Sequence, residues 1–104
     1  MCRIAFKMQL LKGFEAEYKK RHDALWPELA ALLKATGISE YSIFLDQTTN
    51  SLFGVLTATD PAALDNLPAS PVMQRWWQYM ADIMESHPDN SPVSVPLKEV
   101  FYLP

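Results

Sequence analysis

Residues 41–57, with the sequence YSIFLDQTTNSLFGVLT, hold two apolar runs separated by a polar turn. In the first run Tyr41, Ile43 and Leu45 occupy alternate positions, which places them on one face of a strand. Residues 52–57 form the second run. The stretch therefore predicts a β-hairpin in the middle of the chain.

Upstream of this hairpin, residues 2–10 alternate apolar side chains with arginine, alanine, lysine and glutamine. A period of two is typical of a strand that buries one face. Cys2 stands on the apolar side of the run, and we expect it to be a small core residue.

Between that strand and the hairpin the apolar period changes from two to between three and four. Tyr18, His22 and Leu25 follow this spacing, which predicts one face of a helix. Pro27 is suited to the first position of a second helical piece, and Gly37 to the residue just past its end.

Downstream, Pro61 and Pro68 suggest the two ends of a short helix, although this segment is ambiguous. The pair Ser70-Pro71 predicts a helix start with a capping hydroxyl. Apolar residues then recur at helical spacing, at Met73, Trp76, Trp77, Met80, Ile83 and Met84. Residues 95–103 alternate again and predict a last strand.

The resulting order is strand, helix, strand, strand, helix, strand. It predicts an α+β fold of the ferredoxin-like split βαβ kind, as a single domain over residues 1–104. Because the strands carry apolar side chains on both faces, including Phe44 and Phe53, we expect a second copy to stack on the sheet and form a homodimer.

The composition narrows the function classes. A net charge of -3 argues against a nucleic-acid partner. Because the sequence has no long apolar run and no signal peptide, we expect no membrane association and a cytoplasmic location. One cysteine and two histidines give no paired metal-ligand motif, and with three glycines there is no phosphate-binding loop. We therefore expect neither a metal nor a cofactor.

A few side chains are candidates for chemistry. His22 is suited to proton transfer near neutral pH, although its position alone favours a surface or capping histidine. Neighbouring residues of a helix point about 100° apart, so one of Trp76 and Trp77 could face a cavity, or both could serve packing. The hydroxyl-tipped rings of Tyr18 and Tyr41 are ambiguous in the same way.

Several segments resemble the L-rhamnose mutarotase family, and the resemblance runs essentially from end to end. The double tryptophan and the Val-Phe-Tyr-Leu-Pro tail are its most specific parts. One departure is His87, where the family pattern has asparagine. The matching segments are Glu17-Tyr18, Arg21-His22, Trp26-Pro27-Glu28-Leu29, Gln74-Arg75-Trp76-Trp77, Asn90-Ser91-Pro92-Val93 and Glu99-Val100-Phe101-Tyr102-Leu103-Pro104.

The resemblance implies a dimeric α+β barrel and a cofactor-free isomerase that interconverts the anomers of L-rhamnose. It also implies that His22 is the proton donor and that Tyr18, Tyr41, Trp76 and Trp77 bind the sugar. We expect His22 to protonate the ring oxygen, while a tyrosine, a carboxylate or water serves as the base.

Fold alone leaves other functions open. One rival is a cofactor-free monooxygenase-like enzyme of the same barrel architecture. Another is a non-catalytic sugar-binding module, and a third is a purely structural dimeric domain. Acceleration of anomer exchange would separate the mutarotase from all three.

Overall fold

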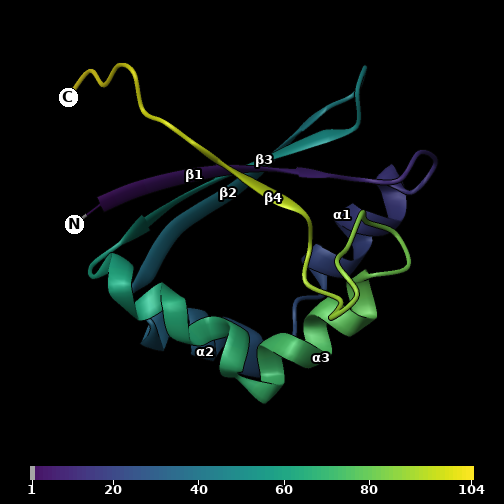
Figure 1. Cartoon of the computed structure of the whole chain (residues 1–104), viewed down its shortest axis with the longest axis horizontal. Coiled ribbons are helices and arrows are strands. Elements are labelled where there is room, and N and C mark those ends of the chain that lie inside the picture. The colour runs from purple at the N-terminus through teal and green to yellow at the C-terminus, as the bar shows by residue number, and fades with distance from the viewer. Residues whose placement is uncertain (1) are drawn as a thin grey trace.

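The computed structural model describes residues 2–104, which form a four-stranded antiparallel sheet with helices packed against one face (Figure 1). The strand order is β2-β3-β1-β4. The elements in chain order are β1 (Cys2–Gln9), α1 (Glu15–Asp23), α2 (Pro27–Ala35), β2 (Ile38–Asp46), β3 (Ser51–Ala58), the 3₁₀ helix η1 (Pro61–Ala69), α3 (Pro71–Met80) and β4 (Ser94–Leu97). This arrangement confirms the predicted α+β split βαβ fold.

One face of the sheet, here called the inner face, is turned toward the helices. Phe6 lies opposite Gly54 and Met8 lies opposite Leu52 in the register of β1 with β3. A Cβ atom on Gly54 would lie 2.5 Å from a ring carbon of Phe6, so the glycine gives the phenyl ring its place. The inner-face side chains are Ile4, Phe6, Met8, Ile43, Leu45, Leu52 and Leu56.

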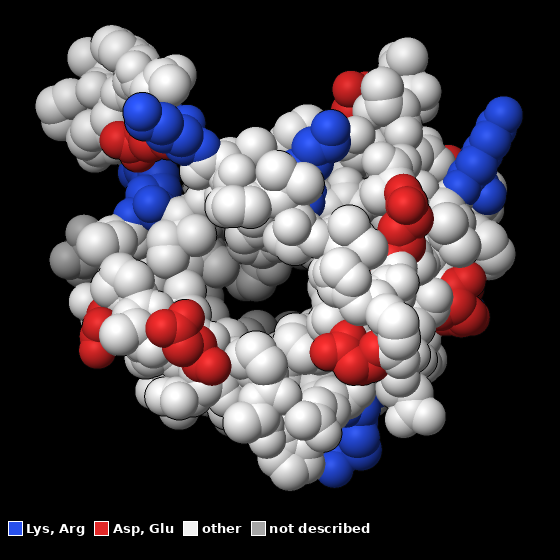
Figure 2. Space-filling model, in the orientation of Figure 1, with Lys and Arg blue, Asp and Glu red and all other residues white. Residues whose placement is uncertain are grey.

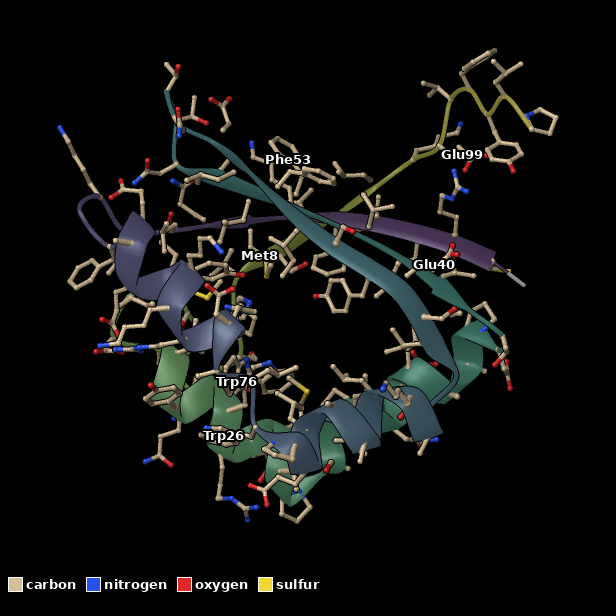
Figure 3. The ribbon with its side chains drawn as sticks, turned by 180° about the vertical axis from the view of Figure 1, so that it is seen from behind. Met8, Trp26, Glu40, Phe53, Trp76 and Glu99 are labelled. Atoms are coloured by element: carbon tan, nitrogen blue, oxygen red, sulfur yellow. The ribbon has the colours of Figure 1, made fainter. Side chains whose placement is uncertain are left out.

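The other side of the sheet, here called the outer face, also carries apolar side chains. Phe44 pairs with Phe53 across β2 and β3, and Phe44 is 62% exposed. Figure 3 shows Phe53 on the side of the sheet opposite Met8. The apolar outer-face residues are Ala5, Phe44, Phe53, Val55, Val95 and Leu97.

Helices α1 and α2 are separated by a sharp break. Trp26 adopts an extended conformation (φ -60°, ψ 130°), and Pro27 then opens α2 as predicted. Since proline lacks an amide hydrogen, the first turn is where a helix tolerates it. At the other end Gly37 has a φ of 92°, the left-handed conformation expected just past a helix.

The segment before α3 corrects two details of the sequence analysis. Helix η1 runs to Ala69 and includes Pro68, so this proline does not end it. Helix α3 begins at Pro71 as predicted, but the hydroxyl of Ser70 makes no capping hydrogen bond. Instead, the backbone carbonyl of Ser70 accepts the amide of Gln74. None of the helices within residues 2–104 is long and apolar enough to cross a bilayer.

Two expectations about the edges of the sheet are wrong. Strand β4 ends at Leu97 rather than Leu103, since it pairs with β1 only along four residues, and residues 98–104 extend away from the sheet. Cys2 is exposed because β4 does not reach it, so it has a strand neighbour on one side alone. Arg3 of β1 forms a cation–π pair with Tyr102 of this tail.

Candidate active site

A cavity of about 1260 Å³ lies between the inner face of the sheet and the helices. Figure 2 shows its opening at the centre of one face, with a rim made mostly of uncharged side chains. Pockets of roughly 300–1,000 Å³ hold drug-sized ligands, so a monosaccharide has ample room here.

His22 stands in the wall of this cavity, one helical turn after Tyr18 on α1. Its ring stacks on the Tyr18 ring at 4.2 Å and meets the Trp76 ring edge-on at 5.4 Å. Its Nδ1 lies 3.0 Å from the backbone carbonyl oxygen of Tyr18. A carbonyl oxygen can only accept a hydrogen bond, so we assign the proton of the neutral imidazole to Nδ1.

Burial lowers the pKa of His22 below its usual value of 6.5, and the Tyr18 carbonyl and the carboxylate of Asp23 oppose this shift in part. The imidazole is therefore neutral at pH 7. With Nδ1 protonated, Nε2 carries a lone pair, and it makes no hydrogen bond within residues 2–104. His22 is thus prepared to accept a proton before it donates one.

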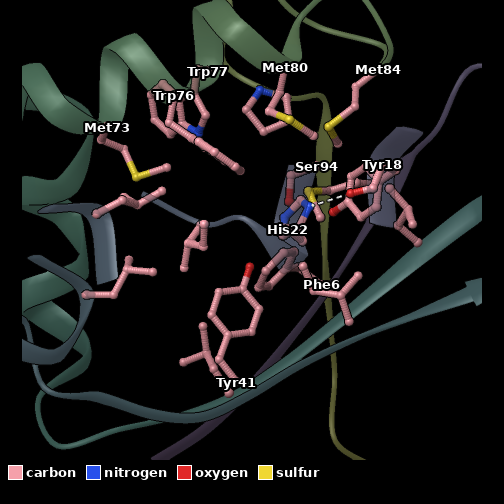
Figure 4. A pocket seen from close by; sticks show the side chains of 18 of the residues that line it. Phe6, Tyr18, His22, Tyr41, Met73, Trp76, Trp77, Met80, Met84 and Ser94 are labelled. Carbon is pink, nitrogen blue, oxygen red and sulfur yellow. Dashed lines mark hydrogen bonds between the residues drawn. The ribbon is translucent and has the colours of Figure 1, made fainter. Parts of the chain in front are cut away.

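Tyr41 enters the cavity from the sheet. The register of β2 with β3 shifts between Ser39 and Ser42, and Glu40 has a φ of 50° at this β-bulge. Such a bulge re-aims a side chain. The Tyr41 ring meets Phe6 edge-on at 6.1 Å, and its hydroxyl points toward the centre of the cavity (Figure 4).

Both tyrosines of the site are held in their protonated form. The Tyr41 side chain is 38% exposed as a whole, but its position inside the cavity removes water from the hydroxyl and raises its pKa to about 12. Burial also raises the pKa of Tyr18, which is 8% exposed. Each hydroxyl can therefore donate a hydrogen bond at neutral pH.

Trp76 and Trp77 serve both packing and the cavity, the two roles that the sequence left open. Trp76 is buried in the core and Trp77 is half-buried, yet both line the cavity from α3 (Figure 4). Together they give the cavity a flat apolar wall. An indole face is a good surface for the C–H side of a sugar ring, and its N–H can serve a hydroxyl.

Other residues of the site were not found from the sequence. Trp26 meets Trp76 edge-on at 5.1 Å and supports it from behind. Phe6, Met73 and Ser94 also line the cavity. The alternation of residues 2–10 predicts that Phe6 is buried, but no local pattern distinguishes a cavity wall from a packed core. His87 is exposed in a turn and is not part of the lining.

The two ends of the cavity differ in chemistry. One end holds the polar groups of Tyr18, His22 and Ser94, and the Tyr41 hydroxyl stands between the ends (Figure 4). The opposite end holds a cluster of aliphatic side chains, which are Ile4, Leu33, Ile38, Leu56, Leu64 and Leu67. Their chain neighbours Lys34, Ser39 and Glu40 also belong to the lining. Within residues 2–104, no three His, Cys, Asp or Glu side chains gather as metal ligands. The arrangement is suited to proton transfer on a small polyhydroxylated ligand.

Sequence comparisons agree with this chemistry. A family model described as L-rhamnose mutarotase matches residues 3–103. An L-rhamnose mutarotase from Jannaschia sp. (strain CCS1) is 60% identical over 104 residues, which cover 100% of both chains. Another, from Mesorhizobium japonicum, is 58% identical and covers 97% of this chain and 96% of the relative.

Solved structures show the same likeness. The crystal structure of an L-rhamnose mutarotase from Formosa agariphila has a TM-score of 0.93 and 52% identity, with 100% of both chains covered. The crystal structure of an antibiotic biosynthesis monooxygenase has a TM-score of 0.52 and 17% identity, and covers 96% of this chain and 99% of the other. At this identity the second likeness bears on the fold alone.

Proposed function

Since the chain belongs to the L-rhamnose mutarotase family, as its sequence predicts, we propose that it interconverts the α and β anomers of L-rhamnose by proton transfer at His22. The activity is that of an isomerase, a carbohydrate 1-epimerase. The observation that carries the assignment of His22 is its Nδ1 hydrogen bond to the Tyr18 carbonyl, which leaves Nε2 for the sugar.

Mutarotation requires a base at the anomeric hydroxyl and an acid at the ring oxygen. Neutral His22 takes the anomeric proton at Nε2, while the ring oxygen receives a proton for which the Tyr41 hydroxyl is the candidate donor. The bond between C1 and the ring oxygen breaks and gives the open-chain aldehyde. After rotation about C1–C2 the ring closes on the other face of the carbonyl, and both protons return.

This order changes the expectation that His22 first protonates the ring oxygen. A neutral imidazole with its hydrogen on Nδ1 has no proton to give at Nε2. In our proposal His22 is the base during ring opening and the proton donor during ring closure, because the two steps are the reverse of each other.

The neighbouring rings hold the sugar in place. Trp76 and Trp77 offer indole faces to the C–H side of the pyranose, and Tyr18 and Tyr41 offer hydroxyls to its polar edge. A site that pairs its polar groups with substrate hydroxyls rejects analogues that leave those groups unpaired. The mechanism consists of proton transfers with no net redox change, and the absence of a cofactor stays a prediction.

We also propose that two copies associate through the outer face of the sheet. Phe44 and Val95 are 62% and 53% exposed on this face, and the apolar tail at Val100–Leu103 lies beyond the sheet as well. A second copy that covered these groups would remove apolar surface from water. The cytoplasmic location and the absence of a nucleic-acid partner stay predictions from the sequence.

Saturation-transfer NMR between the two anomeric signals of L-rhamnose tests the function. The protein should accelerate exchange, and the substitution His22→Ala should slow it by about 10²-fold or more, which is the usual contribution of one acid–base group. His87→Ala is the matched control and should leave the rate unchanged, because His87 is exposed in a turn. Exchange at the wild-type rate in His22→Ala would remove His22 from the mechanism.

A further inference from the structure

We propose that Arg21 is a positioning residue for the reaction. Its side chain joins helix α1, which carries His22, to the end of helix α3, which carries the Trp76 ring beside the imidazole. The inference rests on the proposed role of His22. It concerns a residue that lies next to the imidazole in sequence but points away from the sugar cavity, since Arg21 is not among the lining residues.

The guanidinium of Arg21 is bound on nearly every side. Its Nε donates to Glu17 Oε2 at 2.8 Å, within α1. One terminal nitrogen donates to the carbonyl oxygen of Tyr79 at 2.8 Å and to Asp82 Oδ1 at 2.9 Å, and the other lies 3.3 Å from Asp82 Oδ2. Its central carbon stands 4.4 Å from the centre of the Tyr79 ring. With these partners the side chain is 11% exposed.

The partners of Arg21 outside α1, Tyr79 and Asp82, lie where α3 ends. The last four carbonyls of a helix have no partner inside the helix, and Tyr79 belongs to this last turn. A cation near these carbonyls also interacts favourably with the helix dipole. The Arg21 hydrogen bond lowers the pKa of Asp82, so both groups stay charged at neutral pH. Arg21 therefore caps α3 from α1.

The two helices that Arg21 joins are the two that hold the imidazole. Tyr18 and His22 belong to α1, whereas Trp76, which meets the imidazole edge-on, belongs to α3. The Tyr79 ring under the guanidinium is also linked to the indole beside the imidazole. Tyr79 stacks on Trp26 at 5.6 Å, and Trp26 contacts Trp76. If the tie is lost, α1 can shift against α3, and His22 moves relative to the indole wall that holds the sugar.

The chain offers a matched control on the same helix. Lys20 precedes Arg21 on α1, is exposed and does not line the cavity. Within residues 2–104 its side chain forms no ion pair and does not bridge to another element. Loss of Lys20 therefore removes a positive charge from α1 without releasing α3.

The test compares Arg21→Ala, Arg21→Lys and Lys20→Ala in full-length protein whose folding is verified by circular dichroism. Misplacement by about 1 Å far from the chemistry can cost about 10²-fold, so Arg21→Ala should lower kcat for rhamnose exchange by about that factor while KM changes only a few-fold. Arg21→Lys should restore part of the rate, because lysine keeps the charge but not the planar fork. Lys20→Ala should keep the wild-type rate.

A second readout reports the position of the imidazole directly. The ring protons of His22 lie beside the Tyr18 and Trp76 rings, so their NMR shifts should move in Arg21→Ala and stay fixed in Lys20→Ala. Asp82→Asn weakens the same tie while Arg21 remains, and it carries the test if Arg21→Ala does not fold. It should lower kcat in the same direction by a smaller factor.

The outcomes separate this inference from the proposed function. Wild-type kcat and unmoved His22 signals in folded Arg21→Ala would show that Arg21 serves stability alone, and they would overturn the inference while His22→Ala stays inactive. Absence of exchange activity in the wild-type protein would instead overturn the proposed function.

Discussion

The imidazole of His22 meets a carbonyl oxygen through Nδ1 and has aromatic rings beside it. The hydrogen bond to this carbonyl favours the tautomer with its proton on Nδ1, and the loss of water lowers the pKa of His22. Neither effect depends on a charged partner bonded to the imidazole. These contacts support the proposal that His22, which the sequence marks only as an acid–base candidate, acts as a neutral base.

The lowered pKa of His22 predicts how activity depends on pH. In the proposed mechanism the neutral imidazole is the active form, so exchange of L-rhamnose anomers should be constant above the pKa and fall as the pH is lowered through it. Because burial places this pKa below 6.5, the midpoint of the loss should lie below 6.5. Saturation-transfer rates measured between pH 4.5 and 8 check this midpoint.

The free energy of unfolding should also fall as the pH is lowered. In the unfolded chain His22 takes up a proton near pH 6.5, whereas in the folded chain it resists protonation, so the free energy of unfolding falls as the pH decreases from 6.5 through the folded pKa. His22→Gln removes this contribution and should flatten the curve in urea titrations. An activity midpoint above 6.5 would contradict the assignment of a desolvated, neutral histidine.

Within the sheet, the packing of Phe6 on Gly54 sets the shape of the cavity floor. A methyl group at Gly54 would overlap the Phe6 ring, with ring carbons at 2.5 and 2.7 Å from the new Cβ. Overpacking of this kind costs about 1–3 kcal/mol. We therefore expect Gly54→Ala to lower the free energy of unfolding by that amount in urea denaturation.

A double variant separates overlap from other effects of Gly54→Ala. Phe6→Leu shortens the side chain that stands over Gly54, so the combined variant should be less destabilised than the sum of the two single variants. Simple additivity would mean that the two residues do not interact, contrary to their register in β1 and β3.

The secondary-structure elements show what local patterns can predict. The start of α2 at Pro27 and its end before Gly37 follow from proline and glycine geometry, which is a property of the residues themselves. The last strand was predicted too long, since alternation continues into residues 98–104 while strand pairing stops at Leu97. Alternation reports which side chains could share a face, but only a neighbouring strand makes the segment a strand.

For the whole molecule, the exposed apolar side chains on the outer face of the sheet favour a dimer of two copies. A charged group on an interface between apolar faces is costly, so Phe44→Lys should convert a dimer into a monomer. Sedimentation velocity at micromolar concentration measures the change. Phe14→Lys is the matched control, because Phe14 is 38% exposed on the helical side of the molecule and should leave the dimer intact. A monomeric wild-type protein would contradict the proposed assembly.

Periodicity and motif spacing are carried by neighbouring residues, so the order of the elements, the faces of the strands and the family follow from the sequence. It also singled out Tyr18, His22, Tyr41, Trp76 and Trp77, all of which line one cavity. Three features appear only in the folded chain: the bulge that aims Tyr41 inward, the burial of His22 with Nδ1 beside the Tyr18 carbonyl, and the contacts of Arg21 that join α1 to α3. Desolvation and contacts between distant segments arise when the chain packs, and no local pattern records them.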